Sequence, residues 1–396
     1  MITTSYPRRA GDMAGVFIES LARHLAEGHK IEVEVLAPGE AAAPGHQIQA
    51  GVEVRRLRYF WPARWQKLAY GDGIPRNLRR HGIAWLNIPP FFLAFARGLC
   101  RRARQADVVH AHWGISGAVA VATRCIHRRP VVLSIRGSDV STTMKPIRLA
   151  TNWAIRRADA VISNCSESHE FCREIRGTSE GCHQILNGVQ WHSDEELARL
   201  RQGLEEPGRL NIISVGRLIP ERRHGRLVRA FAALRDEFPQ STLTIVGDGS
   251  EFAPLRDLAA ELGVGGEVRM PGRVPVGEVC RYLCAADLYV SATRIEAAGN
   301  SVVEAAAQGL PIVTTRVGVP GTLVVDGQGG YTLEPDDEQG MVEAMRRMMR
   351  DPDLRSTAGQ KMRRRVEELG LTWPHSARQT VGVYKSLARS DRSEGA

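Results

Sequence analysis

The sequence predicts an α/β protein with two doubly wound domains, each built on a parallel sheet, that face each other across a cleft. Three observations support this prediction: a length of 396 residues, apolar β-branched strings that alternate with helical stretches, and a polar segment near the middle of the chain. A single hydrophobic core rarely grows beyond about 250–300 residues, so this length favours at least two domains.

Short apolar strings predict the strands, and a 3.6-residue apolar period between them predicts the helices. The expected strands are KIEVEVLAP, DVVHAHW, PVVLSIRG, AVISN, LNIISVGR, STLTIVGDG, DLYVSATR and PIVTTR. Helices are expected in stretches such as GVFIESLARHLAEG, RHGRLVRAFAALRDEF and EFAPLRDLAAELG. Binding sites of parallel sheets lie at the carboxyl ends of the strands, so the residues just after each strand are the candidates.

The polar segment near residues 187–208 precedes a fresh strand and marks the domain boundary. We therefore expect a first domain over residues 1–190 and a second over residues 191–370. Residues 371–396 should form a helix with an apolar side, followed by a tail, RSDRSEGA, that we expect to be disordered.

Composition excludes several classes of protein. Hydrophobic residues make up 43% and charged residues 24%, as in ordinary globular proteins. We see no apolar run near the roughly 18 residues that span a bilayer and no signal-peptide core, so a cytoplasmic protein is expected. Seven cysteines without a Cys-x-x-Cys pair predict reduced thiols rather than disulfides or zinc. A dinucleotide-binding glycine motif after a strand and a Walker A motif are both missing, which argues against oxidoreductases and P-loop hydrolases.

The positive charge is concentrated in residues 52–104, which hold twelve Lys and Arg against Glu53 and Asp72. The same segment carries nine of the 23 aromatic residues. This combination suits an anionic surface such as membrane headgroups, a phosphorylated substrate or nucleic acid. A solvated basic helix pair over an aromatic core is the structural alternative, and both interpretations stay open.

Two glutamates flank a small-residue turn in SATRIEAAGNSVVEAAAQGLPIVTT. A strand end followed by a helix start offers free N–H groups and a helix dipole to an anion. Glu304 could then hold a ribose diol and Glu296 a transferred sugar, with Gly299, Asn300 and Ser301 forming the turn between them. The structural alternative is a capping box, in which Ser301 and Glu304 only stabilise the helix start.

A second candidate site follows the strand LNIISV, where Gly216 and Arg217 precede a loop with Arg222 and Arg223. Guanidinium groups at a strand end can grip a diphosphate through bidentate hydrogen bonds. A solvated basic loop is the alternative.

The first domain contributes three further candidates. His110 and His112 end a strand, and we expect them to point to opposite faces, one of them toward the cleft as a polar catalytic contact. Arg136 and Asp139 follow the strand PVVLSI. Gly15 lies in a glycine-bearing loop after the first strand and can bring the backbone close to a phosphate.

Taken in order, these segments resemble the retaining family-four glycosyltransferases, whose GT-B fold has two Rossmann-like domains. The resemblance covers roughly residues 3–387, and its most specific element is the pair of glutamates in EAAGNSVVEAAAQGLPIVTT. It is joined by VGRLIPER, VGDG, NGV, HAH and RGSD and by the final helix, which in that family returns to the N-terminal domain.

The resemblance implies a metal-independent transferase that moves a sugar, with retention, from a nucleotide-sugar to a hydroxyl acceptor. UDP is the expected nucleotide by family frequency, and the nucleotide-sugar is a substrate, so no cofactor is expected. The second domain would hold the donor and the first domain the acceptor.

Individual residues take roles from the same resemblance. Arg217 matches the arginine on the diphosphate, Glu304 the ribose glutamate, Glu296 the glutamate near the donor sugar, His112 the cleft histidine and Gly15 the loop over the phosphates. The catalytic set would therefore be His112, Arg217, Arg222 and Glu296.

Two departures qualify these roles. Arg222 stands where the family usually has lysine. Arg136 stands where it has histidine, which puts the usual acceptor contact of Arg136 and Asp139 in doubt and favours an anionic acceptor. The acceptor would belong to polysaccharide, lipid-linked glycan or glycoside biosynthesis, a membrane surface is a further expected partner, and nucleic acid is not. Alternatives are a sugar-nucleotide epimerase of the same fold and a non-catalytic protein that binds an anionic glycan.

Overall fold

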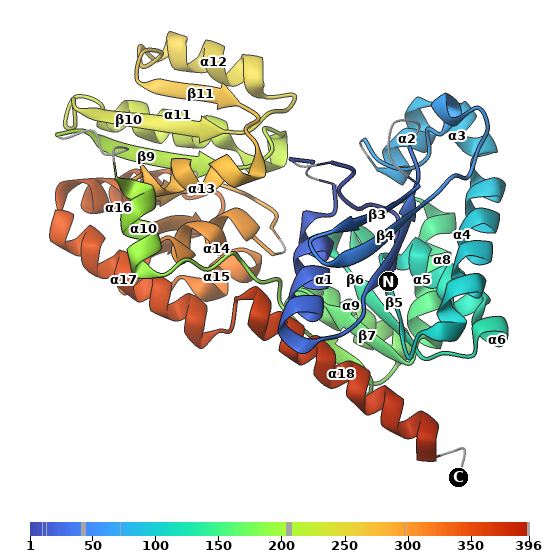
Figure 1. Cartoon of the computed structure of the whole chain (residues 1–396). Helices are drawn as coiled ribbons and strands as arrows, with labels where there is room; N and C mark the ends of the chain where they lie inside the picture. The colour runs from blue at the N-terminus through green and yellow to red at the C-terminus, as the bar shows by residue number, and fades with distance from the viewer. Residues whose placement is uncertain are drawn as a thin grey trace. The chain divides into compact units, whose positions relative to one another are not determined.

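The computed structural model describes residues 1–9, 11–12, 14–40, 45–71, 73–202, 208–296 and 298–393. The chain divides into two compact units (Figure 1). Unit 1 comprises Met1–Asn187 together with Trp373–Ala396, and unit 2 comprises Gly188–Thr372. Each unit is a Rossmann-like α/β domain with one central sheet.

Unit 1 contains an eight-stranded sheet in the order β3-β4-β2-β1-β5-β6-β7-β8. All neighbours pair in parallel except β3 and β4, which form an antiparallel edge. The strands are β1 (Ile2–Thr3), β2 (Glu34–Pro38), β3 (His46–Gln49), β4 (Val52–Leu57), β5 (Val109–His112), β6 (Val131–Ile135), β7 (Ala160–Ser163) and β8 (Cys182–Gln184). The hairpin edge was not predicted, because its strands are short and only one of them has a buried face.

The helices of unit 1 lie between these strands. They are α1 (Val16–His29), α2 (Ile74–Arg80), α3 (Ile83–Leu86), α4 (Ile88–Arg102), α5 (Gly114–Ala122), α6 (Arg124–His127), α7 (Gly137–Val140), α8 (Lys145–Arg157), α9 (Ser166–Arg176) and α18 (Trp373–Ser393), with single 3₁₀ turns η1 (Ala63–Trp65) and η2 (Ala103–Gln105).

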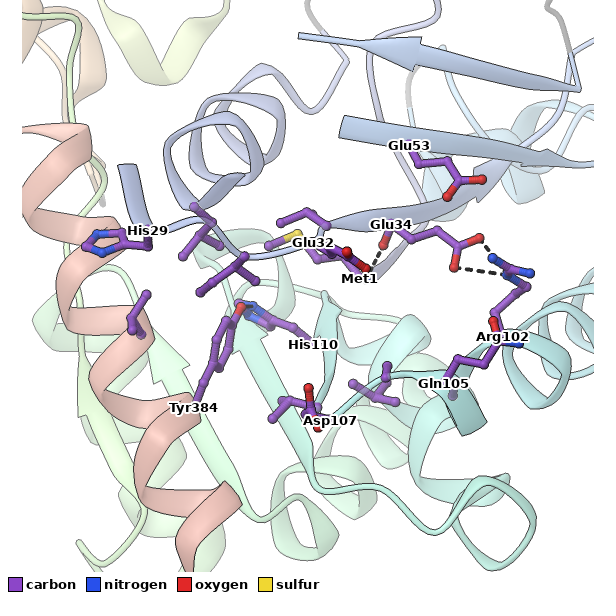
Figure 2. Close-up of a pocket in the computed structure, with 18 of the residues that line it drawn as sticks. Met1, His29, Glu32, Glu34, Glu53, Arg102, Gln105, Asp107, His110 and Tyr384 are labelled. Carbon is purple, nitrogen blue, oxygen red and sulfur yellow. Dashed lines mark hydrogen bonds and ion pairs between the residues drawn. The ribbon is translucent and has the colours of Figure 1, made fainter. Parts of the chain in front are cut away.

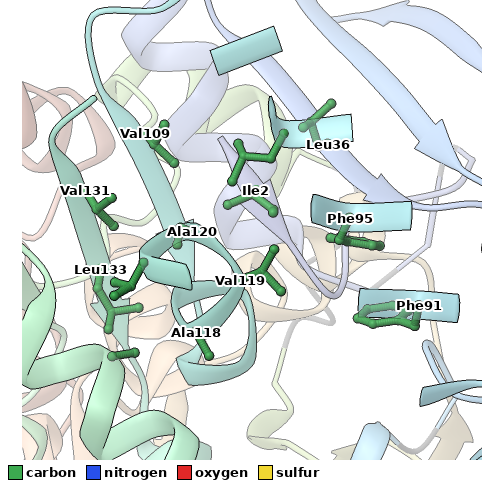
Figure 3. Packing of buried hydrophobic residues seen from close by; sticks show 14 of the residues in the cluster. Ile2, Leu36, Phe91, Phe95, Val109, Ala118, Val119, Ala120, Val131 and Leu133 are labelled. Atoms are coloured by element: carbon green, nitrogen blue, oxygen red, sulfur yellow. The ribbon is translucent and has the colours of Figure 1, made fainter. Parts of the chain in front are cut away.

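A continuous apolar core joins the sheet of unit 1 to α4 and α5 (Figure 3). Leu133 of β6 and Val119 of α5 are buried there, as are Phe91 and Phe95 of α4. The two phenylalanine rings stack with their centroids 4.3 Å apart. Truncating such a ring to alanine typically costs about 3–5 kcal/mol, so this core fixes α4 against the sheet.

The last helix belongs to unit 1, as the sequence predicts. On one side, Trp373 and Val381 of α18 pack with Leu21 and Leu25 of α1. Figure 1 shows α18 in red beside α1. Disorder was expected from residue 389 onward, but the helix continues to Ser393, so that expectation is wrong for residues 389–393. Residues 394–396 lie outside the described residues.

Unit 2 contains a parallel six-stranded sheet in the order β11-β10-β9-β12-β13-β14. Its strands are β9 (Leu210–Val215), β10 (Ser241–Val246), β11 (Val268–Gly272), β12 (Leu288–Val290), β13 (Ile312–Thr315) and β14 (Gly330–Leu333). Its helices are α10 (Asp194–Arg201), η3 (Pro220–Arg222), α11 (His224–Leu234), α12 (Phe252–Glu261), α13 (Val276–Cys284), α14 (Asn300–Ala307), α15 (Gly318–Leu323), α16 (Glu338–Arg350) and α17 (Pro352–Glu368). Strands β9 and β12 are neighbours, so the loops that follow them meet at one edge.

Candidate active site

The loops after β9 and β12 bring two predicted residues of unit 2 into contact. The guanidinium Nη1 of Arg222 is ion-paired with the carboxylate of Glu296. The Arg222 side chain is 23% exposed and that of Glu296 9% exposed, so the pair is largely removed from water. The loop carrying Glu296 is also held by its backbone, because Arg294 N donates to Glu221 O at 2.9 Å.

The end of β9 is held rigidly under the predicted Gly216–Arg217 turn. Gly216 N donates to Val246 O at 3.0 Å, at the end of the neighbouring strand β10. A Cβ on Gly247 would lie 1.8 Å from Gly216 O, so only glycine allows these two loops to approach. Arg217 itself is exposed at this edge. The neighbouring Arg223 points elsewhere, since Nη1 donates to Pro335 O at 2.9 Å.

The capping box that was the structural alternative at Ser301 and Glu304 is not present. Helix α14 begins at Asn300, with Gly299 as its N-cap residue in the left-handed region at φ +57°. Ser301 is thus inside the first turn, and its Oγ accepts from Tyr289 Oη at 2.9 Å. The small-residue turn starts the helix two residues earlier than the pattern suggested, so Glu304 has no capping role.

Glu304 is a buried carboxyl group at the same edge of the sheet. Its carboxylate has no hydrogen-bond or ion-pair partner among the described residues, and burial raises its pKa to about 7. Gly299 keeps the backbone close by, since a Cβ there would lie 2.3 Å from Pro320 Cγ and 3.4 Å from Glu296 Cγ. Unit 2 therefore gathers Arg217, Arg222, Glu296 and Glu304 at the carboxyl edge of its sheet.

In unit 1, the histidines of β5 share one face of the strand. The rings of His110 and His112 stack with centroids 4.2 Å apart, so the prediction of opposite faces was wrong. Side chains alternate with a period of two along a strand, and positions two apart therefore point the same way. His110 is structural, since it contacts Tyr384 Oη at 2.6 Å and Ser134 Oγ at 2.8 Å.

His112 is fully buried, and neither ring nitrogen has a hydrogen-bond partner among the described residues. Burial, reinforced by His110 and Arg136, lowers the pKa of His112 well below 6.5. The imidazole is thus neutral at physiological pH and has two unused polar atoms.

Arg136 and Asp139 have different surroundings. Both carboxylate oxygens of Asp139 accept backbone N–H groups at 2.9 Å, from Gly114 and Arg136, which ties together the starts of α5 and α7. Burial raises the pKa of Asp139 to about 6. The Arg136 guanidinium lies 4.5 Å from the ring centroid of Phe17 and donates to Asn187 Oδ1.

Gly15 is required by the backbone at the start of α1. It is the N-cap residue at φ +74°, and a Cβ would lie 2.4 Å from Ser5 O. Phe17, in the first turn of α1, was missed by the sequence analysis, as was Tyr289 at the edge of unit 2. In the sequence, Phe17 could have been selected only because it follows the glycine turn at Gly15, and Tyr289 only because it lies near the end of a strand.

A cavity of about 960 Å³ lies at the amino ends of β1, β2 and β5 in unit 1 (Figure 2). Glu34, Arg102, His110 and Tyr384 are among its lining residues. Of the predicted site residues only His110 lines it, and the cavity lies at the edge opposite to the one where parallel sheets bind ligands.

Comparisons with known proteins account for both units. Residues 14–188 match the family described as Glycosyl transferase 4-like domain, and residues 198–365 match Glycosyl transferases group 1. The chain is a glycosyltransferase. This class is the one that the order of motifs indicated.

Curated relatives of this glycosyltransferase span most of its length. It is 28% identical to a D-inositol 3-phosphate glycosyltransferase of Streptomyces avermitilis, over 96% of the chain and 85% of the relative. It is 26% identical to an N-acetyl-alpha-D-glucosaminyl L-malate synthase of Bacillus anthracis, over 98% of the chain and 97% of the relative. A glycogen synthase of Mycobacterium tuberculosis is 27% identical over 74% of the chain and 71% of its own length.

Solved structures share the fold of the glycosyltransferase. Sucrose-phosphate synthase from Thermosynechococcus elongatus matches with a TM-score of 0.77 at 19% identity, over 98% of both chains. Anabaena HepE in complex with UDP and glucose matches with a TM-score of 0.72 at 20% identity, over 98% of this chain and 99% of that one. These likenesses agree with the two Rossmann-like sheets of a GT-B fold.

Proposed function

We propose that the glycosyltransferase moves a sugar from a UDP-linked donor to an acceptor hydroxyl, with retention at the anomeric carbon and without a metal ion. The observation that carries this proposal is the grouping in unit 2, where an unpartnered carboxyl, Glu304, lies at the same sheet edge as the Arg222–Glu296 pair. The UDP and UDP-glucose complexes of Anabaena HepE support UDP as the nucleotide.

The leaving group sets the electrostatic task of the site. Breaking the sugar–phosphate bond places negative charge on a diphosphate oxygen, and fixed cations that face this oxygen lower the barrier. Arg217 and Arg222 follow β9 on a rigid backbone and can supply that charge. In the ion pair, Glu296 compensates the charge of Arg222. A diphosphate can take over this role, which leaves Glu296 available to accept from a sugar hydroxyl.

Glu304 is suited to hold the ribose. A vicinal diol has two donors, and a carboxylate has two acceptor oxygens without side-chain partners in the described structure. Hydrogen bonds from the diol would stabilise the charged carboxylate, which burial otherwise disfavours. Nucleotide binding and the ionisation of Glu304 should therefore be coupled.

Unit 1 would bind the acceptor at the carboxyl edge of its own sheet. Arg136 supplies a cation there, and His112 supplies a neutral ring with two unused nitrogens. A guanidinium favours an acceptor that carries a phosphate or carboxylate. Two of the relatives are named for such molecules, D-inositol 3-phosphate and L-malate. Asp139 would act indirectly, by fixing the backbone around Arg136.

Product analysis tests the proposal. The protein is incubated with UDP-sugars, and released UDP is measured for the wild type, Arg217→Ala and a control, Arg256→Ala, on exposed α12. The proposal expects UDP release by the wild type and the control and at least a tenfold loss, roughly, in Arg217→Ala. Isomerised UDP-sugar without release would show an epimerase, and binding without any turnover would show a non-catalytic protein.

A further inference from the structure

Unit 1 exposes a group of large apolar side chains between β4 and β5. Trp61 is 87% exposed, Leu93 69% and Leu86 64%. With the partly exposed rings of Trp65, Trp85 and Phe92, these residues form what we call the aromatic patch. Exposed large apolar side chains that gather on one part of a protein surface mark interaction sites.

The elements that carry the aromatic patch are packed together. Lys67 N donates to Asn87 Oδ1 at 2.8 Å, which ties the loop of Trp61 and Trp65 to the junction of α3 and α4. Tyr59 meets Phe91 edge-on with centroids 5.1 Å apart. Trp85 Nε1 donates to Leu78 O at 2.9 Å, so this ring is anchored although it is half exposed.

The segments that carry the aromatic patch are rich in positive charge, with Asp72 as the one acidic residue between Trp61 and Leu93 in the sequence. From residue 73 to residue 106 the chain contains seven arginines and neither Asp nor Glu. Eight exposed cations belong to the same elements: Arg64, Lys67, Arg76, Arg79, Arg80, Arg97, Arg101 and Arg104. The exposed residues of α4 are apolar in its first turns, at Phe92 and Leu93, and basic in its last turns, at Arg97 and Arg101.

The helical segment Ile83–Gln105 has the length and the mean hydropathy, 1.3, of a membrane span, contrary to the sequence-based expectation of no such run. One face of it is nevertheless part of the core, since Phe91, Phe95 and Leu99 are buried against the sheet (Figure 3). Removing α4 into a bilayer would empty that core. The outward face, not the whole segment, is therefore available to lipid.

We propose that the aromatic patch and its cations dock unit 1 on an anionic lipid bilayer. Tryptophan and leucine side chains enter the boundary between headgroups and acyl chains, and arginines pair with anionic headgroups. This charge complementarity selects a lipid surface of negative charge. Nucleic acid would use the arginines but would leave Leu86 and Leu93 in water. The docking is independent of the donor chemistry of unit 2.

Vesicle flotation of the full chain tests this docking. Vesicles of neutral phosphatidylcholine are compared with vesicles containing about one third phosphatidylglycerol, at low and high salt. We expect flotation with the anionic vesicles only, weakened by salt, and release by alkaline carbonate. Arg97→Glu with Arg101→Glu should lower binding more than about 25-fold, since each cation near such a surface contributes roughly five-fold.

Apolar variants separate insertion from simple charge attraction. Leu86→Ser with Leu93→Ser keeps every cation and should lower binding about tenfold or more. The matched controls are Leu262→Ser and Arg256→Glu on the surface of unit 2, which should bind like the wild type. All of these side chains are exposed, so unchanged melting temperatures are expected.

Three results would overturn the proposal. They are equal flotation of the wild type and both double variants, protein that resists carbonate extraction, and binding to single-stranded RNA without binding to anionic vesicles. The last result would assign the cations to nucleic acid instead.

Discussion

Arg222 and Glu296 form an ion pair in unit 2 although 74 residues separate them in the sequence. The contact exists because β9 and β12 are neighbouring parallel strands whose following loops meet. Burying two charges is costly unless they compensate each other, and a partner left alone is costlier still. The pair thus links the loops after β9 and β12, and under the proposed function a diphosphate would replace Glu296 as the partner of Arg222.

Removing Arg222 should impair both stability and donor binding. In Arg222→Ala, Glu296 loses its ion pair with Arg222, and a diphosphate loses a charged hydrogen bond worth about 1.5–3 kcal/mol. We expect UDP affinity to fall by roughly 10–100-fold, measured by isothermal titration calorimetry. Arg223→Ala is the control, because Arg223 bonds Pro335 O and Asp336, and its UDP affinity should be unchanged.

Because burial raises the pKa of Glu304, the stability of the protein should depend on pH. The folded protein keeps the proton of Glu304 up to about pH 7, whereas the unfolded chain loses it near 4.5. Between these values the folded state binds more protons, so the stability contribution of Glu304 falls as pH rises. Glu304→Gln avoids this loss and should be more stable than the wild type by up to about 3 kcal/mol at pH 8. At pH 4 the gain should vanish, and urea denaturation at both pH values measures it.

The same carboxyl group should couple UDP binding to pH. If the ribose prefers the charged form, binding below pH 7 must expel a proton, and affinity should fall about tenfold per pH unit at the steepest. Calorimetry in buffers of different ionisation enthalpy measures the released proton. Glu304→Gln should remove the slope, and a wild-type affinity independent of pH between 5.5 and 8, roughly, would contradict the ribose role.

Gly299 should not tolerate a side chain. Alanine there combines a left-handed φ with a Cβ 2.3 Å from Pro320 Cγ, so α14 must shift away from its start. A loss of about 2 kcal/mol, or roughly 4–8 °C in melting temperature, is expected. The control is Gly266→Ala, where no atom lies within 4 Å of the added Cβ. Similar melting of both variants would show that the turn is not strained.

Tyr384 should stabilise the attachment of α18 to unit 1. Tyr384→Phe removes the hydroxyl that contacts His110 Nδ1 at 2.6 Å, in surroundings where His110 is buried. Losing a buried hydrogen bond costs about 0.5–1.5 kcal/mol. Thermal unfolding should detect this loss, while Tyr282→Phe on α13 serves as control. Coinciding unfolding curves for Tyr384→Phe and the wild type would show that this hydrogen bond does not contribute to stability.

The fold could be predicted from the sequence because most of its strands are apolar and are regularly separated by helices. The segments before Arg217, Arg136 and Glu296 were recognised for this reason, and each ends at the predicted sheet edge. The edge hairpin β3–β4 was not recognised, since β3 has no buried face and β4 mixes apolar with charged residues instead of forming an apolar run.

The details of the site depended on geometry that the sequence does not display. The partners Arg222 and Glu296 come from distant strands, and only the strand order brings them together. The capping box failed because Gly299, in a left-handed conformation, starts α14 before Ser301 does. The histidines of β5 were assigned to opposite faces by a miscount of the strand period, and the stacked rings of His110 and His112 correct it.

The most direct test of the donor site is UDP binding by the wild type and by Arg217→Ala combined with Glu304→Gln, measured by calorimetry at pH 7.5. We expect saturable binding of one UDP per chain to the wild type and an affinity at least about 100-fold weaker in the double variant. Equal UDP affinity in the two proteins, with the variant correctly folded, would contradict the assignment of these residues to the donor nucleotide.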